Sequence, residues 1–304
     1  MIIDRFLGSE DAKARLNAAL RAGQLPHSLL ICGEAGCGTG YFARLLAADL
    51  LCSDPAAADG EARARRVLEG ADPDCIEVEG EGASGQIRVD RIREVRTAAQ
   101  QTSLGGERRV LIVYGGENMA APAANALLKI LEEPPEGVFF LITARSPAGV
   151  MATIRSRCSA VLLAAPSPQV CAAELRRQGV SAADADLLAG VWQGRIGLAL
   201  QCAAGERRAA FDTAMVACRA VAARDAYALM KLFAPLEKER ERLQTLLADM
   251  VQILSGSFAG LESCPMPAAA AVPAIRALLD TAARLRGNGN ARLVLTGLCL
   301  QLGE

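Results

Sequence analysis

The sequence predicts an α/β domain at the N-terminus, with a parallel sheet wrapped by helices, followed by all-α domains. Short apolar runs alternate with helical periodicity up to residue 166, and such alternation is typical of a parallel sheet. After Pro166 and Pro168 only helical periodicity remains. The chain has 304 residues, and a single hydrophobic core stops growing somewhere below roughly 300 residues. We therefore expect two or three domains.

The composition favours helices packed on one another. The chain is 52% hydrophobic, 22% charged and only 4% aromatic, so its core is expected to consist of Ala, Leu, Val and Ile. A net charge of −1 excludes a strongly basic coat for nucleic acid but allows a local basic stripe. No run reaches the ~18 apolar residues of a membrane span. Ten cysteines without a pairing pattern, and an opening without an export signal, predict reduced thiols and a cytoplasmic protein.

The first elements form a strand, a glycine-rich loop and a helix. Residues 9–22 predict a helix behind Ser9, a residue able to cap it, and the helix is expected to end at Gly23. A strand over 27–32, the loop 33–40 and a helix through 42–51 follow. Residues 53–73 predict a loop with one short helix. The later strands are expected at 75–80, 108–114, 138–144 and 159–165, and the later helices of this domain at 87–101 and 122–133. Domain boundaries are expected near residues 166 and 206, which gives domains 1–166, 167–205 and 206–304.

The loop GEAGCGTG (33–40) has the spacing of a phosphate-binding loop without its charges. In G-x-x-x-x-G-K-[ST], backbone amides cradle the phosphates, the lysine neutralises charge and the hydroxyl holds magnesium. Gly33 and Gly38 keep the spacing and Gly36 adds backbone freedom, but Thr39 replaces the lysine and Gly40 the hydroxyl residue. Catalysis by this loop is not expected. A glycine-rich turn without any ligand is the alternative.

The acidic pair that a nucleotide-hydrolysing site needs is also missing. It should stand at the end of the strand beside the loop, to hold magnesium and orient water. Here the strand runs into Tyr114, Gly115 and Gly116, and Glu117 comes three residues late. Two independent catalytic elements are therefore defective.

Three long motifs carry a family resemblance. NALLKILEEPP (125–135), VFFLITARSP (138–147) and TIRSRC (153–158) resemble the clamp-loader branch of the AAA+ proteins, and within it the delta-prime subunits of bacterial DNA polymerase III. The resemblance covers residues 1–205. It implies an AAA+ P-loop domain, a small helical lid domain and a C-terminal helical collar that mediates association.

The resemblance also implies roles for individual residues. Arg157 matches the arginine of the serine-arginine-cysteine motif, which reaches the γ-phosphate of a neighbour's ATP as an arginine finger. The alternative is that Arg157 only pairs with a local carboxylate, and Arg155 is a weaker candidate. Thr143 falls at the polar sensor position of the fourth strand. Leu198 stands where the second sensor arginine is expected.

Such a subunit would not hydrolyse ATP itself but would support loading of the sliding clamp onto primed DNA. The resemblance implies gamma/tau and delta clamp-loader subunits as partners, which bind the ATP, within the DNA polymerase III holoenzyme. Zinc is not expected, because only Cys52 matches a ligand of the family's four-cysteine module. The alternatives are an ATPase with an unconventional loop, in which Glu117 replaces the missing pair, and a scaffold whose Arg157 is silent.

A row of arginines is a candidate contact for DNA. The predicted helix at 87–101 carries basic residues that could face a phosphate backbone without reading bases. A solvated helix face is the alternative. The arginines concerned are Arg88, Arg91, Arg93 and Arg96.

Overall fold

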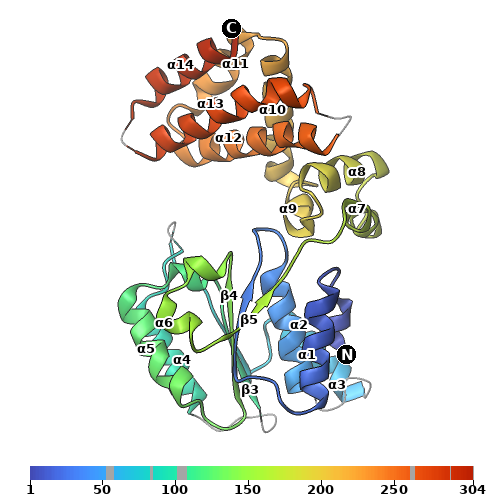
Figure 1. The fold of residues 1–304 in the computed structure, drawn as a ribbon, viewed down its shortest axis with the longest axis vertical. Helices are drawn as coiled ribbons and strands as arrows, with labels where there is room; N and C mark the ends of the chain where they lie inside the picture. The colour runs from blue at the N-terminus through green and yellow to red at the C-terminus, as the bar shows by residue number, and fades with distance from the viewer. Residues whose placement is uncertain (53–57, 83–84, 101–107, 261–263, 288, 304) are drawn as a thin grey trace. The chain divides into compact units, whose positions relative to one another are not determined.

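The computed structural model describes residues 1–52, 58–82, 85–100, 108–260, 264–287 and 289–303. The chain divides into two compact units, Met1–Pro166 and Ser167–Glu304, which are described separately below. Figure 1 shows the sheet in the first unit and only helices in the described part of the second. No helix of the described residues is long and apolar enough to cross a membrane.

The first unit is built on a sheet in which every strand pair is parallel. The strand order is β2-β3-β4-β1-β5. The predicted parallel sheet is therefore confirmed. The strands β1, β3 and β4 are buried along almost their whole length, which agrees with their continuous apolar runs. The strands are β1 (Ser28–Cys32), β2 (Cys75–Val78), β3 (Arg109–Val113), β4 (Val138–Ala144) and β5 (Ser159–Leu162).

Helices cover both faces of this sheet (Figure 1). Alternate strand residues point to opposite faces, so Leu29 and Ile31 join one buried cluster while Leu30 and Cys32 join the other. The first cluster contains side chains of α1 (Glu10–Arg21), α2 (Thr39–Leu51) and α3 (Ala58–Leu68). The second contains side chains of α4 (Val89–Ala99), α5 (Ala121–Glu132) and α6 (Ala152–Arg155).

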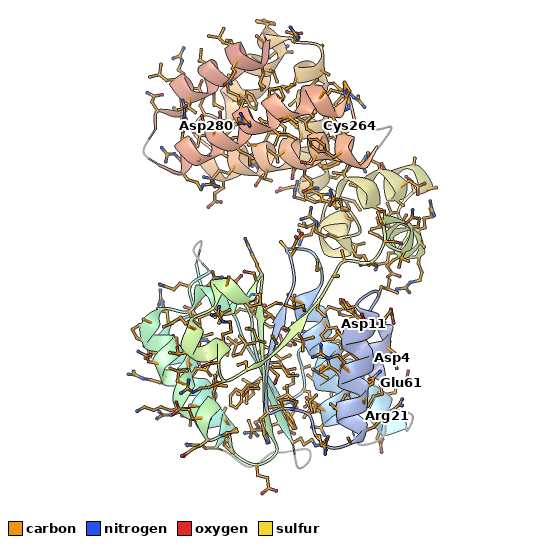
Figure 2. The ribbon with its side chains drawn as sticks, viewed as in Figure 1. Asp4, Asp11, Arg21, Glu61, Cys264 and Asp280 are labelled. Carbon is orange, nitrogen blue, oxygen red and sulfur yellow. The ribbon has the colours of Figure 1, made fainter. Side chains whose placement is uncertain are left out.

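The N-terminal segment is fixed by polar contacts. The carboxylate of Asp49, on α2, accepts hydrogen bonds from the backbone N–H groups of Ile2 and Ile3 in the 3₁₀ helix η1 (Ile2–Arg5), at 2.7 and 2.8 Å. Asp4, labelled in Figure 2, accepts one from Asn17 on α1. The capping role expected for Ser9 is wrong. Its hydroxyl forms no cap and instead contacts the backbone of Ala164, because Ser9 has a left-handed conformation (φ 55°).

A buried ion cluster lies at the start of β2 and β3. Arg63 on α3 donates to Asp72 at 3.1 Å and to Asp74 at 3.0 Å, and Arg109 reaches the other oxygen of Asp74 at 3.2 Å. The side chain of Asp74 is fully buried. The short helix expected within 53–73 is thus present as α3. The guanidinium of its Arg63 offsets the charge of two buried carboxylates, Asp72 and Asp74.

In the second unit, every regular element among the described residues is a helix. Its α-helices are α7 (Pro168–Arg177), α8 (Ala182–Val191), α9 (Ile196–Gln201), α10 (Gly205–Ala222), α11 (Ala226–Phe233), α12 (Arg240–Ser255), α13 (Ala268–Arg286) and α14 (Ala291–Gly303). Ser167 and Ser181 cap α7 and α8 by accepting backbone hydrogen bonds. One cluster of buried side chains extends from Cys171 on α7 to Leu302 on α14. The division near residue 206 therefore stays a prediction.

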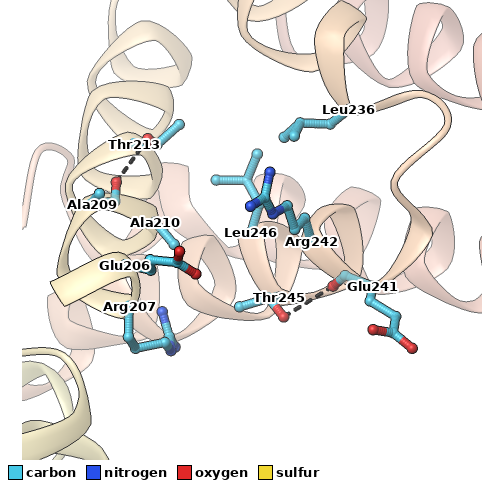
Figure 3. A pocket seen from close by; sticks show the side chains of 10 residues that line it. All are labelled: Glu206, Arg207, Ala209, Ala210, Thr213, Leu236, Glu241, Arg242, Thr245 and Leu246. Atoms are coloured by element: carbon cyan, nitrogen blue, oxygen red, sulfur yellow. Dashed lines mark hydrogen bonds between the residues drawn. The ribbon is translucent and has the colours of Figure 1, made fainter. Parts of the chain in front are cut away.

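A hollow of about 650 Å³ lies between α10 and α12 (Figure 3). Leu236 and Leu246 contribute apolar surface to it. The hydroxyls of Thr213 and Thr245 donate to backbone carbonyls one turn earlier in their own helices. Charged side chains line the hollow as well, namely Glu206, Arg207, Glu241 and Arg242.

Candidate functional site

The glycine loop lies between β1 and α2. It follows β1, and α2 begins at Thr39, within the last two residues of the loop. Gly36 and Gly38 have φ angles of 84° and 83°, a region that side-chain-bearing residues rarely adopt. The N–H of Gly33 donates to the carbonyl of Ala144 at the end of β4, at 3.1 Å. The predicted strand, loop and helix are thus in place.

Side chains of the protein itself fill the start of α2. A Cβ added to Gly40 would lie 3.0 Å from Cε1 of Tyr114, and one added to Gly33 would lie 3.1 Å from Cγ2 of Thr39. The ring of Tyr114 therefore packs closely on position 40 and would have to shift by a few tenths of an ångström for a larger residue there. Residues 33–40 contain no Lys or Arg, and Glu34 adds a negative charge. The loop thus lacks the cation that a phosphate-binding loop carries.

The cation beside the loop is already paired. Arg44, one turn into α2, binds Glu77 of β2 in two hydrogen bonds of 2.7 and 2.6 Å, and its guanidinium lies 5.8 Å from the centre of the Tyr114 ring. The hydrogen bond to Glu77 raises the pKa of Arg44 above its usual range. Burial raises the pKa of the Tyr114 hydroxyl in the same direction, so it stays neutral. Arg44 thus links α2 to β2 through Glu77 and to the end of β3 through Tyr114.

Thr143 and Glu117 lie at the ends of neighbouring strands. Thr143 is 4% exposed, and its Oγ1 accepts a hydrogen bond from the N–H of Gly115 at 3.2 Å. One carboxylate oxygen of Glu117 accepts from the N–H of Arg145 at 3.3 Å. Burial, and then the charge of Glu117, raises the pKa of Cys32 to about 11. Glu117 is therefore close to the start of the loop, although no cation of the loop faces it.

Arg157 lies on the surface between α6 and β5, and its guanidinium has local partners. Nη2 donates to Oε1 of Glu132 at 2.5 Å, and Nη1 donates to the carbonyl of Thr153 at 3.0 Å and to Oγ of Ser156 at 3.3 Å. The side chain is 35% exposed. Arg155 donates only to the carbonyl of Pro147 in the part of the chain that is described. The local pair named as the alternative exists, and the finger role stays a prediction.

A family model described as DNA polymerase III, delta subunit, matches residues 8–167. The chain belongs to this family. It is 41% identical over 148 residues to DNA polymerase III subunit delta' of Pseudomonas aeruginosa, a stretch that covers 48% of this chain and 44% of the relative. It is 34% identical over 178 residues to the Escherichia coli subunit delta', with 58% and 53% covered. The chain spans about half the length of the curated relatives it matches.

A solved structure extends the likeness to the whole fold. The gamma subunit-related protein of Thermotoga maritima superposes with a TM-score of 0.58 over 95% of this chain and 99% of that chain. The two are 18% identical, so this likeness concerns the fold alone. The family model and the two curated subunits delta' show that this chain is a delta-prime-like member of the DNA polymerase III delta subunit family.

Leu198, at the position where the resemblance implies a second sensor arginine, is apolar. Leu198 lies on α9 and packs against the core of the second unit. The nearest arginine, Arg195, donates to Oε1 of Gln252 at 2.7 Å and to the carbonyl of Trp192, and its guanidinium lies 5.6 Å from the Trp192 ring centre. Arg195 thus serves packing within the second unit.

Cys52, the first ligand of the zinc module expected in this family, is buried, and its thiol donates to the carbonyl of Gly60. Among the residues that the structure describes, no group of three or more His, Cys, Asp or Glu could hold a metal ion. The absence of zinc stays a prediction, since part of 53–73 lies outside the described residues.

The arginines of α4 are mostly paired with acids. Arg88 and Arg91 lie 3.8 and 3.9 Å from Glu81, while Arg91 also binds Glu94 and Arg93 binds Asp90. Arg96 forms no ion pair with a described residue. The acids offset much of the positive charge of the row, which favours the solvated face over a DNA contact, and the DNA contact stays a prediction.

Sequence reasoning missed two contacts that define the site. Neither the packing of Tyr114 on Gly40 nor the pair of Arg157 with Glu132 has a local signal, because each joins residues far apart in the chain. The absence of a side chain at position 40 was the only hint of the first.

Proposed function

We propose that this chain is a delta-prime-like, non-hydrolysing clamp-loader subunit that supports loading of a sliding clamp onto primed DNA. The observation that carries the proposal is the contact between Tyr114 and Gly40 in a loop without Lys or Arg. With Thr39 in place of the lysine and Gly40 in place of the hydroxyl residue, the loop lacks the groups that neutralise phosphate charge and hold magnesium. Its neighbours in the complex would then bind and hydrolyse the ATP, in the cytoplasm.

In this proposal Arg157 is the group that acts on a neighbour. It follows α6 in the serine-arginine-cysteine motif, is partly exposed, and forms its hydrogen bonds at the exposed surface rather than in a buried network. An arginine supplied to a phosphoryl-transfer site stabilises the charge on the transferred group and is worth about 10³–10⁵ in rate. Gamma/tau and delta subunits are the proposed partners.

The test is the DNA-dependent ATPase rate of a complex reconstituted from this chain and the gamma/tau and delta subunits of the same organism. Arg157→Ala should abolish turnover at the one ATP site that this chain completes. Arg155→Ala removes the same charge two residues away and tests the weaker candidate. It should leave the rate unchanged, and a loss with Arg155→Ala alone would assign the finger to Arg155. Unchanged turnover with Arg157→Ala and intact assembly would favour the scaffold instead.

A second candidate function is an ATPase in which Glu117 replaces the acidic pair. The observation in its favour is that Oε2 of Glu117 is buried without a hydrogen-bond partner among the described residues, close to the residue that precedes the loop. Turnover by the isolated chain that disappears with Glu117→Gln would establish this function, and absence of turnover at saturating ATP would remove it.

A further inference from the structure

Glu132 and Arg157 form a contact between the segments NALLKILEEPP (125–135) and TIRSRC (153–158). Glu132 is the last residue of α5, and Arg157 stands two residues after α6, which packs against α5. Nη2 of Arg157 lies 2.5 Å from Oε1 of Glu132, and the pair joins residues 25 positions apart. The other contacts of the guanidinium are to Thr153 and Ser156 of its own turn.

The charges of this pair decide how Arg157 can act. A carboxylate in contact with a guanidinium offsets its positive charge, so the paired arginine stabilises a nearby phosphate less than a free one. Glu132 is 50% exposed and Arg157 35% exposed. Exposed ion pairs of this kind are weak, whereas a phosphate offers more negative charge and several acceptor oxygens. A γ-phosphate brought close therefore displaces the carboxylate.

We propose that Glu132 is a positioning residue that holds Arg157 in a resting pair and releases it when the γ-phosphate of a neighbour's nucleotide arrives. This inference rests on the proposed function of Arg157. The pair keeps the guanidinium near the surface and oriented by α5 while no nucleotide is present. It also makes the carboxylate a competitor of the phosphate for the same nitrogen atom, Nη2 of Arg157.

The competition predicts a measurable effect of Glu132→Gln. Removing the negative charge frees Arg157, so the KM for ATP in the reconstituted complex should fall on the order of 1.5- to 5-fold, the range that corresponds to an exposed ion pair. The kcat should stay nearly constant, because Arg157 reaches the same final position. Glu133→Gln is the matched control. Glu133 is the next residue, is exposed, and has no ion pair with a described residue.

A second readout uses the chain alone. Phenylglyoxal modifies unpaired arginines, and mass spectrometry measures the rate at Arg157. We expect this rate to rise on the order of 1.5- to 5-fold with Glu132→Gln and to stay unchanged with Glu133→Gln. Urea unfolding of both variants checks that neither has lost its fold, which an exposed pair should not affect strongly.

The outcomes separate this inference from the function on which it rests. If Arg157→Ala lowers ATPase turnover but Glu132→Gln and Glu133→Gln have equal KM and equal Arg157 reactivity, the resting pair is overturned and the finger stands. A fall in kcat with Glu132→Gln would also overturn it, since Glu132 would then orient the active arginine. If Arg157→Ala is silent, both ideas fail. With Arg157→Ala present, Glu132→Gln should cause no further change.

Discussion

The packing of Tyr114 on Gly40 predicts that a glycine-to-alanine substitution has opposite effects on stability at two helical glycines, Gly40 and Gly297. Gly40→Ala places a methyl group 3.0 Å from Cε1 and 3.5 Å from Cδ1 of Tyr114, whereas Gly297, in the exposed face of α14, has no heavy atom within 4 Å of an added Cβ. Alanine in a helix is favoured over glycine by about 0.5–1 kcal/mol. Overpacking a well-filled site costs about 1–3 kcal/mol.

We therefore expect Gly297→Ala to raise the free energy of unfolding by about 0.5–1 kcal/mol, and Gly40→Ala to be about 1–3 kcal/mol less favourable than that. The midpoint of urea unfolding at constant m-value measures both. The decisive comparison is a double-mutant cycle with Tyr114→Ser, in which Gly40→Ala should lose its penalty. Equal gains at positions 40 and 297, or additivity of Gly40→Ala with Tyr114→Ser, would refute the claim that Tyr114 closes the loop.

Three further changes test contacts that hold the fold. Asp49→Ala removes the acceptor of two backbone hydrogen bonds and should lower the free energy of unfolding by about 2–4 kcal/mol; a loss near zero in urea would contradict the anchoring of η1. Arg63→Ala leaves Asp72 and Asp74 with less compensation and should cost about 3–5 kcal/mol by the same measurement. The pKa of Asp184 is lowered, first by Arg208 and then by Ser181. Asp184 therefore stabilises the fold above its ordinary pKa. The difference in urea midpoint between the wild type and Asp184→Asn should be full at pH 7 and should shrink as the pH falls from the ordinary pKa of an aspartate through the lowered one. A difference that stays constant as the pH is lowered through this range would exclude this origin.

The strands and the loop were predictable because their signals are local. The apolar runs that became β1, β3 and β4 are buried on both faces, which is the arrangement that uninterrupted apolar runs favour. The helix expected over 122–133 ends one residue earlier, at Glu132. Glu133 precedes Pro134 and leaves the helical conformation (φ −130°, ψ 71°), because the proline ring disfavours a helical conformation in the preceding residue.

The side-chain partners were not predictable in the same way. Arg157 could be picked out by its motif, but its partner depends on the packing of α5 against α6. The hydroxyl of Ser9 was expected at the helix start and is used at Ala164, at the far end of the first unit's sequence. Such contacts arise from the tertiary fold. It brings together segments far apart in the chain, which the periodicity of the sequence does not predict.

The contact of Tyr114 with Gly40 has a consequence for how this loop can change over generations. A working loop needs a cation at position 39, a hydroxyl at position 40 and an acid at position 114. A hydroxyl residue at 40 would require the present ring to shift by a few tenths of an ångström, and an acid at 114 would replace the ring that now lies beside Arg44 and Glu77. A working loop would therefore require coordinated changes at positions 39, 40 and 114 rather than a single substitution.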